Sequence, residues 1–367
     1  MLAFVSLTLS PTLGRGVEAP EALEAPAVPP PPTPHEPVLG LSIERGEREE
    51  QFRVLDSGKP IFEGPFDACE AKLIEALKER HGTGKLNWNV PTLGGKQFWA
   101  DVEIFCGWRI QESVLTGHYR LLDRGDVRRA WGKYEACRTA LEEARVKQGL
   151  KPRSDHLVVV LHGLFRSKDS FGSMVRALEE AGYEVAALNY PSTRRDLSEH
   201  ARQVSTVLDR ARGCQTVSFV THSLGGIVAR QLLSLDAPWR KTIKLGRLVM
   251  IAPPSRGSEI AGDLQDWLPF QVLAGPAAQR LTPKQAENVP LPPKEIEFGI
   301  VAGGSANGKG YNPRLHGDDD GVVTVVSTQL PGAKDFLRIE ALHSFIMNKP
   351  ECVQGTLRFL KTGKFAE

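Results

Sequence analysis

The chain has 367 residues, which is enough for two domains or one large one. Its formal net charge is +2 and 25% of its residues are charged, so its composition gives no argument for a nucleic-acid or strongly acidic partner. The sequence contains no P-loop and no zinc-ligand spacing, and five scattered cysteines exclude a disulfide-rich scaffold.

Residues 1–38 combine an apolar start with a proline-rich stretch. The run at 2–9 (LAFVSLTL) is too short to span a membrane and has no Lys or Arg before it. A degenerate export signal or anchor and a frayed apolar tail therefore both stay open as interpretations. Residues 18–37 are rich in Pro, Ala and Glu and predict an extended linker. Together these features favour an extracytoplasmic or membrane-associated location, with contact to a membrane surface, over a cytoplasmic one.

Residues 39–150 predict a small α+β accessory domain without a catalytic constellation. The hydrophobic pattern predicts strands and helices at 52–55, 59–62, 68–80, 98–105, 119–122 and 134–150. Three cysteines of this region leave two interpretations open: one disulfide in an oxidising compartment, or buried free thiols. These cysteines are Cys69, Cys106 and Cys137.

From residue 151 to the C-terminus, strands and helices alternate. The run at 157–161 (LVVVL) is typical of a strand buried on both faces of a parallel sheet. Further strands are predicted at 185–189, 217–220, 248–251, 298–302 and 337–342, with helices at 173–181, 198–212 and 225–235. This alternation predicts an α/β fold with a mostly parallel, doubly wound sheet, whose functional residues lie at the carboxyl ends of its strands.

The stretch 217–230 (VSFVTHSLGGIVAR) changes from strand pattern to helical pattern at Ser223. A serine at a sharp strand-to-helix turn, followed by small residues such as Gly225, is typical of a nucleophile elbow. The usual pattern is G-x-S-x-G, and Thr221 stands here at the first glycine. Its neighbour His222 is expected to point away from the site and to be structural.

A serine hydroxyl needs a base and a group that orients the base. Of the three acids in the segment GDDDGVV, Asp320 is chosen because it directly precedes Gly321 and an apolar run. Asp318 and Asp319 are expected to face solvent or to bond to the loop, and the run lacks the alternating ligand spacing of a calcium site. His343 follows the last predicted strand and is the expected base.

The oxyanion that forms during acyl transfer needs preorganised N–H donors. The residue after the nucleophile, Leu224, is expected to supply one donor at its helix N-terminus. The second is expected from Leu164, in the loop after the first strand of the predicted sheet. Gly163 allows that loop to turn sharply, and His162 is expected to brace it.

These segments resemble the H-G-L, G-H-S-x-G-G, D-G-x-V and H-S elements of the bacterial lipase and esterase branch of the α/β-hydrolases. The resemblance covers residues from about 155 to the C-terminus, departs from the pattern at Thr221, and has no counterpart for residues 39–150. It implies an α/β-hydrolase fold and a Ser-Asp-His acyl hydrolase that needs no cofactor and no metal.

The predicted activity is hydrolysis of carboxylic esters, with a small-molecule or lipid ester as substrate. Residues 260–281 carry apolar side chains. Two interpretations stay open: the segment forms an apolar lid over the site, or it covers the hydrophobic core. Thioesterase, amidase and acyltransferase activities would use the same triad. A non-catalytic binding protein with a hydrolase fold is the alternative from another class, and a docking or gating role is a further hypothesis for residues 39–150.

Overall fold

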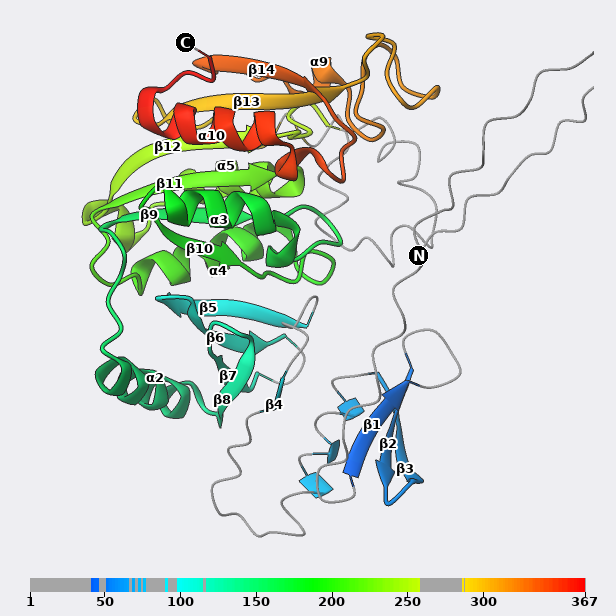
Figure 1. Cartoon of the computed structure of the whole chain (residues 1–367), viewed down its shortest axis with the longest axis vertical. Helices are drawn as coiled ribbons and strands as arrows, with labels where there is room; N and C mark the ends of the chain where they lie inside the picture. Colours follow the sequence, from blue (N-terminus) through cyan, green and yellow to red (C-terminus); the bar gives the residue numbers. More distant parts are fainter. Residues whose placement is uncertain are drawn as a thin grey trace, which may run out of the picture. The chain divides into compact units, whose positions relative to one another are not determined.

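Figure 1 shows the computed structural model of the chain. The residues that it describes are 41–45, 51–65, 68–69, 72–73, 75–76, 90–91, 98–114, 117–257, 286 and 288–366. The chain forms two compact units, Met1–Gly84 and Lys85–Glu367. The division into 1–38, 39–150 and 151–367 made from the sequence stays a prediction.

The first unit contains an antiparallel sheet in the order β1-β2-β3. Its strands are β1 (Leu41–Arg45), β2 (Phe52–Asp56) and β3 (Lys59–Gly64). Ser57 and Gly58 have φ angles of 50° and 81°, as a tight two-residue hairpin turn requires. The strands predicted at 52–55 and 59–62 are therefore confirmed, whereas most of the helix predicted at 68–80 lies outside the described residues.

The second unit begins with an antiparallel sheet in the order β4-β8-β7-β6-β5. Its strands are β4 (Val90–Pro91), β5 (Trp99–Phe105), β6 (Trp108–Ser113), β7 (Tyr119–Leu122) and β8 (Val127–Gly132). Helix α2 (Tyr134–Gln148) packs on β6, β7 and β8 through the buried side chains of Cys137 and Leu141. All five cysteines are free thiols, which favours the second interpretation of Cys69, Cys106 and Cys137.

A six-stranded parallel sheet forms the rest of this unit, in the order β10-β9-β11-β12-β13-β14 (Figure 1). Its strands are β9 (His156–Leu161), β10 (Glu184–Leu188), β11 (Thr216–His222), β12 (Lys244–Ile251), β13 (Glu297–Gly304) and β14 (Asp335–Glu340). The predicted parallel α/β sheet is confirmed, and its strand order and preceding small sheet are those of an α/β-hydrolase fold.

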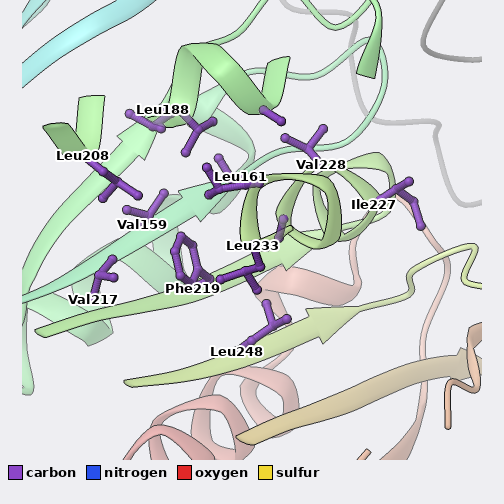
Figure 2. Packing of buried hydrophobic residues seen from close by; sticks show 14 of the residues in the cluster. Val159, Leu161, Leu188, Leu208, Val217, Phe219, Ile227, Val228, Leu233 and Leu248 are labelled. Atoms are coloured by element: carbon purple, nitrogen blue, oxygen red, sulfur yellow. The ribbon is translucent and has the colours of Figure 1, made fainter. Parts of the chain in front are cut away.

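Helices cover both faces of the parallel sheet because successive strand residues point to opposite sides. In β9, Leu157, Val159 and Leu161 enter one core, and Val158 and Val160 enter the other. Helices α4 (Leu197–Asp209) and α5 (Leu224–Leu233) pack on the first side, and Figure 2 shows the interdigitated apolar side chains there. Helices α3 (Gly172–Glu180) and α10 (Pro350–Thr362) pack on the second.

Short helices complete the described part of the unit. They are η1 (Lys168–Phe171), η2 (Pro238–Lys241), α9 (Val325–Thr328) and η3 (Ile346–Asn348). Helix α4 begins with a reciprocal capping box. The Asp196 carboxylate accepts from the Glu199 N–H, and the Glu199 carboxylate accepts from the Asp196 N–H. No helix in the described ranges combines the length and the hydropathy that crossing a membrane requires.

Candidate active site

The nucleophile elbow lies where β11 ends and α5 begins. Ser223 has φ 52° and ψ −122°, a backbone conformation that is rare for any residue with a side chain. Its N–H donates to the Ile251 carbonyl at 2.9 Å, and its carbonyl accepts from the Gly226 N–H at 2.9 Å. Strain held in place in this way is typical of functional sites, and the geometry is that of the strand-to-helix turn of α/β-hydrolases.

Small residues after Ser223 allow helix and strands to approach closely. A Cβ on Gly225 would lie 2.4 Å from the Leu161 carbonyl oxygen, and one on Gly226 would lie 3.1 Å from the Met250 side chain. Thr221 is accommodated because its hydroxyl donates to the Val249 carbonyl at 3.2 Å. The departure from the usual glycine therefore has a local structural explanation.

We expect the Gly225→Ala variant to lose about 1–3 kcal/mol of unfolding free energy, because backbone atoms of β9 would have to move away from α5. Urea denaturation measures this change. The Gly172→Ala variant is the matched control: Gly172 also lies in the first turn of a helix, but a Cβ there would meet no atom within 4 Å. Equal stability of the two variants would contradict the close approach.

Asp320 and His343 come together at the carboxyl ends of β13 and β14. His343 Nδ1 lies 2.7 Å from Asp320 Oδ2, and the His343 N–H donates to the Asp320 carbonyl at 2.8 Å. The other carboxylate oxygen accepts from the N–H groups of Val322 and Val323, at 3.0 and 2.8 Å. The carboxylate is fully buried, so it can orient one imidazole nitrogen and leave the other for proton transfer.

The other two acids of the predicted turn have structural contacts. Asp318 forms an ion pair with Arg338 at 2.7 Å, which helps to hold its pKa below the usual range. Asp319 is fully buried, so the expectation that it faces solvent is wrong, whereas the expectation that it bonds to the loop is confirmed. Its Oδ1 accepts from the backbone N–H groups of Tyr311, Asn312 and Gly321.

His222 connects the elbow to the predicted base. Its Nε2 donates to the His343 carbonyl at 3.0 Å, and the centroids of the His222 and His343 rings lie 4.7 Å apart. The expectation that it points away from the site is therefore wrong, because its ring packs against His343. Complete burial, together with the positive potential of His343, lowers the pKa of His222 well below its usual value. A neutral His222 can brace the site without adding charge to it.

The loop after β9 approaches the elbow. A Cβ on Gly163 would lie 3.1 Å from the Ser223 Cβ and 2.9 Å from His222 Nδ1, so only glycine fits there. The Leu224 N–H lies in the first turn of α5, where N–H groups have no intrahelical acceptor. The two predicted donors, Leu164 and Leu224, are thus carried by segments that meet at Ser223.

Other N–H groups of the loop are already bonded. The Phe165 N–H donates to Ser192 Oγ at 3.2 Å, and the Arg166 N–H donates to the Gly163 carbonyl at 3.2 Å. Within the described part of the chain, the Leu164 N–H has no protein acceptor. Its role as an oxyanion donor stays a prediction.

His162 braces the loop, as predicted. Its Nδ1 donates to the Gly163 carbonyl at 2.8 Å, and its Nε2 accepts from the Tyr190 N–H at 3.4 Å. The rings of Tyr190 and His162 stack at 4.1 Å, and the Tyr190 hydroxyl donates to the His162 carbonyl. Burial lowers the pKa of His162 to about 4, so it is a neutral structural residue near neutral pH.

Sequence reasoning missed Tyr190 and the apolar residues beside the site. Tyr190 is the second residue after β10, a strand of the parallel sheet, and that position could have indicated it. Phe165, Leu342 and Phe345 are 57%, 43% and 62% exposed, although each lies within two residues of a predicted catalytic or oxyanion residue. The predicted lid at 260–281 lies outside the described residues. The part of the chain that is described contains no cluster of His, Cys, Asp and Glu suited to a metal ion.

Comparisons with known proteins found one family model and many solved structures that match this chain. A family model described as a domain of unknown function, DUF7379, matches residues 121–274, from β7 to beyond β12. A search of curated proteins found no match. Many solved structures match, and those named next are lipases and esterases.

The mature lipase BlEst2 from Bacillus licheniformis is 19% identical, with a TM-score of 0.46, over 58% of this chain and 92% of that one. The phospholipase PlaB from Legionella pneumophila is 19% identical, with a TM-score of 0.39, over 47% and 45%. A metagenomic carboxyl esterase is 16% identical, with a TM-score of 0.40, over 51% and 64%.

Proposed function

We propose that the chain is a serine hydrolase that cleaves carboxylic esters. Ser223 attacks the ester carbonyl, His343 takes the serine proton and returns it to the leaving group, and Asp320 orients His343. The N–H groups of Leu164 and Leu224 stabilise the oxyanion. The observation that carries the proposal is the buried Asp320–His343 pair at 2.7 Å, held beside the strained Ser223 through His222.

The proposed substrate has an apolar acyl chain. Phe165, Leu342 and Phe345 expose aromatic and aliphatic surface on the segments that carry the oxyanion donor and the base. An apolar chain that covers this surface would be stabilised by roughly 25 cal/mol per Å² of buried apolar area. We also propose that this exposed apolar surface contacts a membrane surface when the substrate is a lipid.

The test uses p-nitrophenyl esters of graded chain length together with a fluorophosphonate probe. We expect turnover to rise from acetate to medium-chain esters, and mass spectrometry to find the probe on Ser223. The Ser223→Ala variant serves as the control for labelling. Wild-type protein that neither hydrolyses any ester nor takes up the probe would refute the function. Matched thioester and amide substrates decide between the activities that share this triad.

A further inference from the structure

The antiparallel sheet joins the parallel sheet at one buried carboxylate. Asp101 lies on β5, the edge strand of its sheet, and is fully buried. The Asn189 N–H, just after β10, donates to Asp101 Oδ2 at 2.7 Å, and the Asp101 N–H donates to the Asn189 carbonyl at 3.0 Å. The two sheets are thus connected by a reciprocal pair of hydrogen bonds at the carboxyl end of β10.

Two further side chains reinforce this junction. Arg109 on β6 donates to Asp101 Oδ2 at 2.9 Å and to the Ala187 carbonyl at 3.2 Å. Gln203 on α4 donates to the carbonyls of Asp101 and Asn189, at 2.9 and 3.0 Å. Burial of a carboxylate is costly, and here the charge is compensated by a buried guanidinium and by N–H donors.

These contacts hold residues 189–192, which follow β10. The same residues contact the loop after β9 that carries Leu164. Asn189 Oδ1 accepts from the Lys168 N–H at 2.9 Å. The next residue, Tyr190, donates its hydroxyl to the His162 carbonyl and stacks on the His162 ring. Ser192 then accepts from the Phe165 N–H. A continuous set of buried contacts therefore runs from Asp101 through Asn189 and Tyr190 to the peptide groups around Leu164.

We propose that Asp101 is a positioning residue for the oxyanion hole, which makes the small antiparallel sheet part of the catalytic apparatus. This inference rests on the proposed function. The Asp101 carboxylate fixes the peptide group at Asn189, and Tyr190, which follows it, fixes the carbonyl of His162. The direction of the Leu164 N–H, two residues further on, depends on that carbonyl. Because an oxyanion donor acts only when it is aimed correctly, a small rotation of the loop lowers the rate of acyl transfer.

The test compares two variants that interrupt this set of contacts with one that does not. Asp101→Asn removes the charge at the junction, and Tyr190→Phe removes only the hydroxyl that bonds to His162. Glu103→Gln is the matched control. Glu103 lies on the same strand and is also buried, but it contacts Tyr134, Arg138 and Arg212, away from the loop.

Each protein is titrated to its endpoint with fluorophosphonate, so that rates refer to folded active sites. We expect kcat per titrated site to fall roughly 10- to 100-fold in Asp101→Asn and Tyr190→Phe, with KM within about threefold of wild type. The affinity for a trifluoromethyl ketone, which forms a tetrahedral oxyanion on the serine, should fall by a similar factor. Glu103→Gln should change both values less than about threefold.

Wild-type values of kcat and ketone affinity in both Asp101→Asn and Tyr190→Phe would overturn the positioning role. So would equal losses in Glu103→Gln, because they would indicate general loosening of the sheet. If Asp101→Asn yields no titratable sites, Tyr190→Phe alone decides. Failure of the proposed function is distinct, because wild-type protein would then show neither ester hydrolysis nor labelling.

Discussion

The Asp320→Asn variant should fold normally and hydrolyse esters roughly 10³- to 10⁴-fold more slowly than wild type. The Asp320 Oδ2 atom accepts from His343 Nδ1, while Oδ1 accepts from two backbone N–H groups. An amide in this position must turn its NH₂ group either toward His343 or toward those N–H donors. In the first orientation the imidazole is held in the wrong tautomer, and in the second two buried donors lose their acceptor. Steady-state kinetics measures the loss.

The neighbouring carboxylate supplies the control for this experiment. Asp318→Asn removes the same charge two residues away, but Asp318 is paired with Arg338 and does not contact His343. We expect it to keep kcat within about threefold of wild type. A loss in Asp318→Asn as large as that in Asp320→Asn would mean that the acid had been assigned to the wrong residue.

The free energy of unfolding should fall by about 3 kcal/mol between pH 7.5 and pH 5.5 from His162 and His200 alone, because these two histidines and His222 are buried in neutral form. Burial lowers the pKa of His162 to about 4 and that of His200 to about 3, and it lowers the pKa of His222 well below the usual value of 6.5. Below pH 6.5 the unfolded chain binds protons that the folded protein does not bind. Stability is therefore complete above pH 6.5 and is lost as the pH falls.

Urea denaturation at several pH values and constant ionic strength measures this slope. The His200→Phe variant removes one of the three groups from a buried site beside Tyr190, so it should lower the slope by about one proton. The comparison also separates the contribution of His200 to the pH dependence from that of Asp101. Burial raises the pKa of Asp101, so Asp101 changes stability with pH in the opposite direction. An unchanged slope in His200→Phe would show that His200 is not neutral in the folded protein.

Much of the parallel half of the fold could be predicted because central strands such as β9 contain continuous apolar runs, as in Leu157–Leu161. The positions of Ser223 and of the Asp320–His343 pair follow from motifs at the ends of such strands. Strands β6 and β8 were not predicted, because buried charges such as Arg109 and Arg128 interrupt their apolar alternation. Arg109 bonds to the Ala187 carbonyl, 78 positions away in the sequence, so its burial becomes evident only in the folded chain.

Helix α10 was also missed, although Pro350 at its first position is a typical start signal. The contacts from Asp101 to Asn189 join residues 88 positions apart. No local pattern indicates such a pairing, because it depends on which strand edges meet after both sheets have formed. For the same reason, the assignment of residues 39–150 to an accessory domain could not reveal that β5 contacts the hydrolase fold.

The junction at Asn189 also covers one edge of the parallel sheet. Strand β10 is the outermost strand of the parallel sheet, and a free strand edge offers backbone groups to any other extended chain. Here the Ala187 carbonyl and both backbone groups of Asn189 are bonded to β5, Arg109 or Gln203. A chain that began at residue 151 would leave the Ala187 carbonyl and the Asn189 N–H without these partners, whereas Gln203 would still bond to the Asn189 carbonyl. The small sheet thus covers part of an edge to which another extended chain could otherwise bond.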